Sequence, residues 1–208
     1  MQIIFIRHAE KQHHGSIHLS ERGFIRATHL SDYLLHPYND FKRPDMAYIM
    51  IRKRNRSERC LETMEPTLRQ SKMGYELVKR HNTASLAMYI RQAAITDYDY
   101  NDDLSVVVCW QHSRIVDFLN ILGADTVTSW GIDPEARDDD KDCFDVTWVC
   151  NFHKGGLSLS VYKQFDIDAD GKPFYTHNRD HVWWNKTYPI RTHEGPYSAS
   201  RTSLCSIS

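Results

Sequence analysis

Short apolar runs alternate with amphipathic stretches along most of the chain. The short runs, rich in β-branched residues, predict buried strands, and apolar residues recurring every three or four positions predict helices. Strands are expected over residues 2–6, 46–51, 75–78, 104–110, 144–150 and 157–165, and helices over 20–35, from about 55 to 68, 83–94 and 114–122.

The helix that opens at Ser20 has the clearest boundary signals. Ser20 can cap its first turn, and His36-Pro37 ends it. Its expected core face is formed by Phe24, Ala27, Leu30 and Leu34. The next helix has a second apolar stripe and a proline that either kinks it or begins a further helix: Leu61, Met64, Leu68 and Pro66.

This second helix begins in a basic segment. Asn55 and Glu58 have the spacing of an N-cap and the third helical residue. Arg59 then lies in the first turn, where a cation opposes the helix dipole unless a bound anion reverses the penalty. Arg59 is therefore a candidate phosphate ligand. For its neighbours Arg52, Arg54 and Arg56, a solvated basic face is the favoured interpretation.

The opening strand ends in a cation and an imidazole, Arg7 and His8. In open α/β sheets, ligands bind at the carboxyl ends of the strands. We hypothesise that His8 is a nucleophile toward phosphorus and that Arg7 holds the phosphate. Taken alone, the pair is equally explained by an ion-pair partner beside a capped histidine.

The strand over residues 104–110 ends in the same way, in Gln111-His112, and the helix after it stops at Gly123 as at a C-cap. If right-handed crossovers join the strands, the strands are parallel and both histidines share one sheet edge. The alternative for His112 alone is a helix-capping or core histidine.

Bulk properties narrow the class of protein. The 208 residues and net charge of −1 predict one domain over 1–208, with a polar C-terminal tail from about residue 189. The balanced charge argues against nucleic-acid or membrane partners recognised by bulk charge. The five cysteines form no C-x-x-C pair, which argues against a disulfide framework or zinc ribbon and for a cytoplasmic protein.

Two stretches imitate metal sites without the full ligand pattern. His13 and His14 have no cysteine or carboxylate cluster at ligand spacing. Residues 166–171 resemble the first half of a calcium loop, but His177 occupies the twelfth position in place of glutamate. We expect a turn between strands at 166–171 and no metal.

Four motifs in combination resemble the histidine phosphatase superfamily, and specifically a poorly characterised subgroup of small members. They are Arg7-His8-Ala9-Glu10 after a strand, Leu19-Ser20-Glu21-Arg22-Gly23, Arg59-Cys60-Leu61-Glu62-Thr63, and His112 at the end of an apolar strand. The resemblance spans about residues 1–150. It implies an α/β fold of the phosphoglycerate-mutase-like type, a three-layer α/β/α sandwich with a mostly parallel central sheet.

The same resemblance implies the roles of four residues. His8 attacks the phosphoryl group and becomes phosphohistidine, while Arg7, Arg59 and His112 bind the phosphoryl oxygens and stabilise the transition state. No metal or other cofactor is implied. The chemistry is reasonable because guanidinium groups bind phosphoryl oxygens in bidentate fashion, and an imidazole is nucleophilic when it is neutral and oriented.

The sequence departs from the family pattern at the general acid. Superfamily members carry a glutamate between the arginine helix and the second histidine, or an acid directly after that histidine. Here Ser113 and Arg114 follow His112, and residues 79–94 contain no carboxylate. The nearest candidate acid is Glu76, with Asp97 and Asp99 behind it.

Three functions follow, in order of preference. The first is a metal-independent phosphatase acting on a phosphorylated small molecule or a phosphoprotein through phospho-His8. The second is a catalytically weak or inactive relative that binds phosphorylated ligands, which the missing acid favours. The third is a phosphoglycerate-mutase-type phosphotransferase.

Overall fold

The computed structural model describes residues 1–13, 16–37, 41–52, 57–96, 103–124, 144–154 and 156–174, and the backbone of 182–189. The strands of its central sheet are β1 (Gln2–Arg7), β2 (Met46–Ile51), β3 (Gly74–Lys79), β4 (Ser105–Trp110), β5 (Val146–His153), β6 (Gly156–Lys163) and β9 (Val182–Pro189). The helices are α1 (Glu21–Leu35), α2 (Arg59–Ser71), α3 (Thr83–Thr96) and α5 (His112–Leu122), with a short 3-10 turn η1 (Arg80–Asn82).

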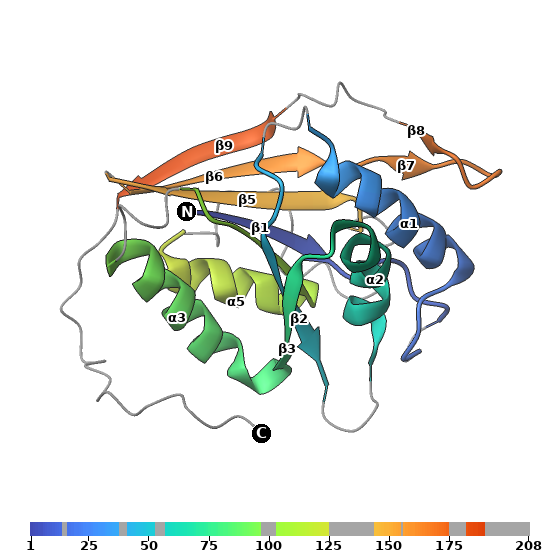
Figure 1. Ribbon diagram of the computed structural model, residues 1–208, viewed down its shortest axis with the longest axis horizontal. Coiled ribbons are helices and arrows are strands. Elements are labelled where there is room, and N and C mark those ends of the chain that lie inside the picture. Colours follow the sequence, from blue (N-terminus) through green and yellow to red (C-terminus); the bar gives the residue numbers. More distant parts are fainter. Residues whose placement is uncertain are drawn as a thin grey trace.

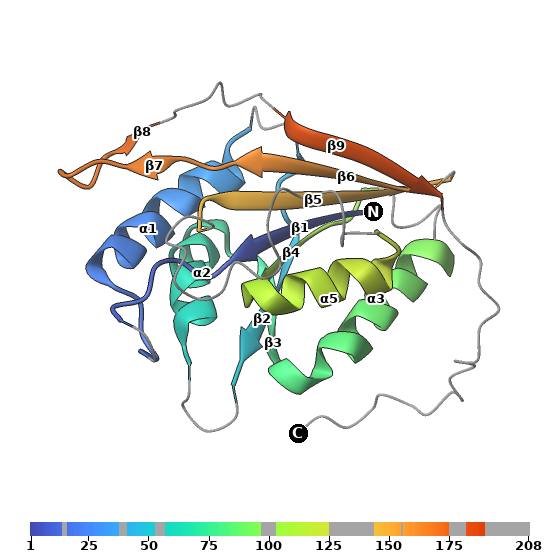
Figure 2. The ribbon, with the colours of Figure 1, turned by 180° about the vertical axis from the view of Figure 1, so that it is seen from behind.

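The central sheet has seven strands in the order β3-β2-β4-β1-β5-β6-β9 (Figure 1). Strands β3, β2, β4 and β1 are parallel to one another, and β5, β6 and β9 continue the sheet in antiparallel pairing. The connections from β1 to β2 and from β2 to β3 run toward the β3 edge of the sheet, and the connection from β3 to β4 runs back in the opposite direction. Because such parallel crossovers are right-handed, the reversal places helices on both faces of the sheet. Helices α1 and α2 pack together, as do α3 and α5 (Figure 2). The expected α/β/α architecture is confirmed.

Complete burial explains the continuous apolar runs. The side chains of Ile3, Ile4, Phe5 and Ile6 in β1 are fully buried between the two helical layers. A strand covered on both faces needs apolar side chains on both, which removes the alternating pattern of a half-exposed strand. The parallel strands were therefore predicted almost to the residue.

Several expectations about the helices need correction. Phe24 is 47% exposed and does not join the α1 core face, whereas Ala27, Leu30 and Leu34 are buried as expected. Helix α2 begins at Arg59, later than expected, and Glu58 before it makes no side-chain cap; Asn55 lies outside the described residues. Pro66 lies inside this single helix.

The C-terminal part of the sheet also differs from expectation. Strand β9 was not predicted, and the segment 166–171 belongs to a hairpin of β7 (Asp166–Ile167) and β8 (Pro173–Phe174). The carboxylate of Asp168 accepts hydrogen bonds from the backbone N–H groups of Asp170 and Lys172, which closes the expected turn. No helix in the described part of the chain is long and apolar enough to cross a membrane.

Candidate active site

His8 and His112 follow neighbouring parallel strands. Arg7 at the end of β1 pairs in register with Trp110 at the end of β4, and the His8 N–H donates to the Trp110 carbonyl over 3.3 Å. Adjacent strands lie about 4.8 Å apart. The backbone therefore brings both histidines to the carboxyl edge of the sheet, as the strand pattern predicted.

The His8 imidazole is held in a defined orientation. It is 2% exposed, and its Nδ1 lies 2.8 Å from the carbonyl oxygen of Ala9. A carbonyl oxygen can only accept, so Nδ1 carries the hydrogen and the Nε2 lone pair is left for another partner. This tautomer is the one that a nucleophilic Nε2 requires.

Burial and neighbouring cations keep this imidazole neutral. The pKa of His8 lies well below its ordinary value of 6.5, chiefly because burial disfavours the charged ring and then because Arg59, Arg7 and His112 repel a proton. The hydrogen bond to Ala9 opposes the shift without reversing it. Arg59, Arg7 and His112 are thus near enough to act on the charge of His8, and the register of β1 with β4 puts His8 and His112 at the same sheet edge.

A phenyl ring from the turn before β5 lies beside Arg7 and His8. The guanidinium of Arg7, which is 5% exposed, lies 4.0 Å from the centre of the Phe144 ring. The centres of the Phe144 and His8 rings are 6.0 Å apart. The next residue, Asp145, forms an ion pair of 3.0 Å with Lys163 in β6. Phe144 therefore packs against the guanidinium of Arg7, a contact that sequence reasoning missed.

The first turns of α2 are attached to the loop that carries His8. The Ala9 N–H donates to Thr63 Oγ1 over 2.9 Å, and the Thr63 hydroxyl donates to the Arg59 carbonyl over 2.7 Å. Arg59 Nε in turn donates to Ser57 Oγ over 3.0 Å. One buried threonine thus links the backbones of the nucleophile loop and the arginine helix, which sets the position of Arg59 relative to His8.

The remaining motif residues support this loop from the side of α1. The carboxylate of Glu10 accepts from Arg26 Nε at 2.8 and 3.0 Å, and Arg26 also donates to the Phe165 carbonyl. A Cβ on Gly23 would lie 2.2 Å from the Glu10 carbonyl oxygen, so only glycine allows α1 to approach. Arg26 is 3% exposed, which makes this a buried ion pair.

The structure does not bring Glu76 to this site. Glu76 is an exposed residue in the middle of β3, paired in register with Tyr48. Strand β3 is at the sheet edge, separated from β1 by β2 and β4. Asp97 and Asp99 lie outside the described residues. No carboxylate is among the described groups that shift the His8 pKa, and the general acid is not assigned.

Arg52 does not lie on the solvated basic face that its sequence context favoured. It is half-buried, and its Nη2 donates to Gln111 Oε1 over 3.0 Å. Arg54 and Arg56 are outside the described residues. Arg52 therefore belongs to the edge of the sheet that carries the two histidines.

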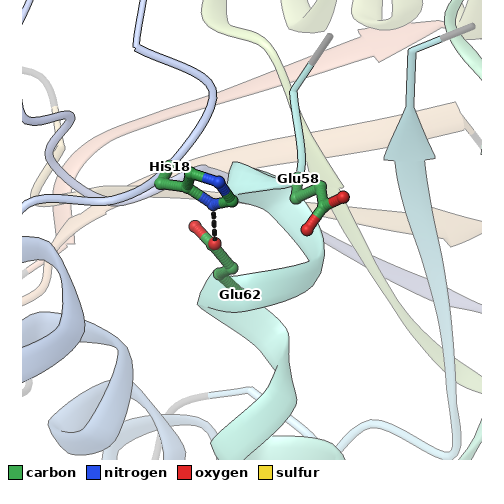
Figure 3. Close-up of side chains that lie close together, drawn as sticks. All are labelled: His18, Glu58 and Glu62. Atoms are coloured by element: carbon green, nitrogen blue, oxygen red, sulfur yellow. Dashed lines mark hydrogen bonds and ion pairs between the residues drawn. The ribbon is translucent and has the colours of Figure 1, made fainter. Parts of the chain in front are cut away.

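A histidine and two glutamates lie close together at the N-terminal end of α2 (Figure 3). His18, Glu58 and Glu62 have side-chain atoms close enough to share a cation, the one such grouping found in the described residues. The Glu62 carboxylate, however, already accepts from His18 Nδ1 at 2.5 Å and from the Leu19 N–H at 2.8 Å. These bonds fasten the loop before α1 to α2, and they explain the cluster without a metal. His13 is not part of it, and His14 lies outside the described residues.

Comparisons with known proteins return structural neighbours only. No family model and no curated protein matches the sequence. The chain is similar to a protein named as phosphohistidine phosphatase SixA from Nakamurella multipartitia, with 14% identity, 72% of this chain and 83% of that chain covered, and a TM-score of 0.41.

Two further solved structures belong to the same group of matches. One is the protein histidine phosphatase SixA complexed with tungstate, at 11% identity, with 90% of this chain and 97% of that chain covered and a TM-score of 0.42. The other is phosphoglycerate mutase from Plasmodium falciparum, at 14% identity, with 90% and 99% covered and a TM-score of 0.45.

Proposed function

We propose that this protein is a metal-independent phosphatase that hydrolyses a phosphomonoester or a phosphoprotein through a phosphohistidine on His8. The observation that carries the proposal is the state of the His8 ring: buried, neutral, and bonded through Nδ1 to a carbonyl that can only accept. Such a ring presents its Nε2 lone pair among cationic groups, where a phosphate dianion is attracted and held.

The reaction follows from these positions. Guanidinium groups of Arg7 and Arg59, with His112, bind the phosphoryl oxygens and neutralise charge that spreads over them in the transition state. The Nε2 atom forms the new N–P bond as the P–O bond to the leaving group breaks, and the leaving oxygen departs with the bonding electron pair. Water then attacks phosphorus, releases inorganic phosphate and returns the electron pair to Nε2.

The lack of an assigned carboxylate predicts which leaving groups react well. A leaving oxygen of low pKa departs without a proton, whereas an alkoxide needs one. Loss of general acid assistance typically costs about 10²–10⁴-fold in rate. We therefore expect aryl phosphates to be hydrolysed faster than alkyl phosphates by roughly this factor.

Trapping of the intermediate tests the proposal directly. The protein is incubated with 32P-labelled aryl phosphate and quenched in base, where phosphohistidine survives, and the label is mapped by digestion. We expect label on His8, attached at Nε2, and none in His8→Asn. His18→Asn is the matched control and should label like the wild type. Turnover with no label on His8, or label on another residue, would overturn the mechanism.

A phosphate-binding protein without turnover is the second candidate. It is favoured by the absence of a carboxylate among the described groups that act on His8. Saturable binding of inorganic phosphate with neither label nor turnover would establish this candidate and reject the first.

A further inference from the structure

Three arginines gather beside the proposed catalytic residues. Arg52 follows β2, Arg80 follows β3, and Arg114 lies in the first turn of α5 after β4. Strands β3, β2 and β4 are consecutive and parallel in the sheet, so their carboxyl ends lie along one edge. The cluster therefore extends the edge that carries His8 and His112 toward β3. We refer to Arg52, Arg80 and Arg114 as the arginine cluster.

The arginine cluster is directly connected to the histidine edge. Arg52 Nη2 donates to the side-chain oxygen of Gln111 over 3.0 Å, and Gln111 immediately precedes His112. Arg80 is close enough to both other arginines to be repelled by them, and this repulsion, after burial, lowers the pKa of its guanidinium. The three cations thus lie near one another along the sheet edge that also carries His112.

The positive charge of the cluster is incompletely balanced by the described residues. Asp117 is the one carboxylate that acts on Arg80, and it already forms an ion pair of 2.6 Å with Arg114. The Nε–H groups of Arg52 and Arg80 are buried and have no hydrogen-bond acceptor within the described ranges. Buried donors without acceptors are costly, and they are rare in native structures. An anion bound among these arginines would relieve the repulsion between them.

Hydrogen bonds hold the backbone of Arg80 in place. The Thr83 hydroxyl donates to the Arg80 carbonyl over 2.6 Å, and the Trp110 indole N–H donates to Thr83 Oγ1 over 3.1 Å. Trp110 is the last residue of β4 and is fully buried. This chain of bonds fixes the Arg80 backbone relative to the strand that carries His112. A donor whose backbone is held in this way loses less entropy when it binds an anion. The Arg114 side chain, in contrast, is 46% exposed.

We propose that the arginine cluster is a second anion subsite, and that the substrate is a small phosphoester carrying another phosphate or carboxylate group beyond the scissile bond. This inference rests on the proposed function, because it assigns the leaving-group side of the same site. Guanidinium pairs bind phosphate and carboxylate oxygens in the same bidentate manner, so the second group is defined here as an oxyanion.

Kinetics with paired substrates test the subsite. Phenyl phosphate is compared with phenyl phosphates bearing a second phosphate or a carboxylate on the ring. We expect kcat/KM of the best bis-anionic substrate to exceed that of phenyl phosphate, and Arg80→Gln to reduce this advantage by roughly 10- to 100-fold while changing the phenyl phosphate value by less than about 3-fold. The bis-anionic substrate with the higher kcat/KM identifies the second group as a phosphate or a carboxylate. An equal loss for both substrates, or no preference in the wild type, would overturn the subsite.

Arg69→Gln is the matched control. Arg69 lies on α2, its side chain is 78% exposed, and its described partner is Glu65 on the same helix. The Arg69→Gln substitution removes one positive charge without changing the arginine cluster, so it should leave the preference for bis-anionic substrates intact. A similar loss of preference in Arg69→Gln would show that the protein's overall charge, and not the cluster, attracts the second anion.

Phosphate binding separates failure of the subsite from failure of the proposed function. Calorimetric titration with inorganic phosphate should give two sites per wild-type chain and one in the Arg52→Gln/Arg80→Gln variant. Two sites without a His8 adduct would reject the phosphatase and retain the subsite. One site in the wild type would reject the subsite even if His8 is labelled. Without ligand, Arg80→Gln should melt at the same or a higher temperature, because one repelling charge is gone.

Discussion

His8 and His18 lie in one loop region and are attached to adjacent residues of α2, yet their environments shift the imidazole pKa in opposite directions. The loop of His8 is held by Thr63 through the Ala9 N–H, and His18 is held by Glu62. His8 is 2% exposed and its pKa is lowered well below 6.5 by burial and cations. The His18 side chain is 47% exposed and its pKa is raised, because the Glu62 carboxylate stabilises the charged ring (Figure 3).

The difference shows how a histidine is oriented without becoming charged. Both rings use Nδ1 as the anchored atom. A carboxylate partner orients the ring but also favours its protonation, whereas a backbone carbonyl orients the ring with a much smaller charge effect. His8 has the carbonyl and His18 has the carboxylate. The first arrangement suits a nucleophile, and the second suits a structural contact between a loop and a helix.

Replacement of the two histidines should give the largest difference. We expect His8→Asn to reduce kcat for an aryl phosphate to the background rate, because Asn presents no nucleophilic nitrogen in place of Nε2. His18→Asn should change kcat by less than about 3-fold, since His18 contacts α2 and not the phosphoryl group. Initial rates at saturating substrate measure both. Equal losses in the two variants would mean that the comparison concerns loop folding and not chemistry.

The residues whose positions were predictable are those at the ends of the buried parallel strands. Arg7, His8 and His112 stand where an apolar run stops, and the register of β1 with β4 follows once the strands are parallel. Arg59 was identified because its positive charge is unfavourable in the first turn of a helix unless an anion binds there. In each case a charged or imidazole side chain occupies a position that the surrounding strand or helix pattern does not favour, and this exception is visible in the sequence.

The contributions that could not be predicted depend on tertiary position alone. Phe144 approaches Arg7 only because β5 pairs antiparallel with β1, and nothing in its own segment indicates that pairing. Phe24 fits a helical apolar stripe but lies where the core ends. Glu76 was near enough in sequence to act as an acid, but the strand order places β3 three positions from β1.

Loss of the ion pair that supports the loop should be the largest effect on stability. Arg26→Gln removes the closer of the two arginines that pair with Glu10 and leaves Arg22 at 3.6 Å, so we expect a loss somewhat below the about 3–5 kcal/mol that breaking a fully buried pair costs. Urea unfolding at pH 7 measures the change. Arg69→Gln breaks an exposed pair with Glu65 and should cost less than about 1 kcal/mol. If both variants lose the same amount, the Glu10–Arg26 pair is not buried in solution.

Removal of the threonine link should disturb His8 and spare His18. Thr63→Val keeps the size of the side chain but leaves the buried Ala9 N–H without its acceptor, which costs about 1–3 kcal/mol. We also expect a lower kcat, because the backbone that orients His8 is released. Thr28→Val, at an exposed position of α1, is the matched control. A normal kcat in a destabilised Thr63→Val would show that the threonine acts on stability alone.

The smallest expected effect is the pH dependence, and it should have opposite signs at the two histidines. Because the folded-state pKa of His18 is raised, its contact with Glu62 stabilises the protein fully below pH 6.5 and loses that contribution as pH rises through the raised pKa. Because the folded-state pKa of His8 is lowered, only the unfolded chain takes up that proton below pH 6.5, so His8 reduces stability as pH falls. Imidazole 15N shifts should show His8 still neutral below pH 6.5 and His18 titrating above it. In Glu62→Gln the His18 titration should move down toward 6.5 while His8 is unchanged; a shift of both together would show that the two rings titrate as one coupled system.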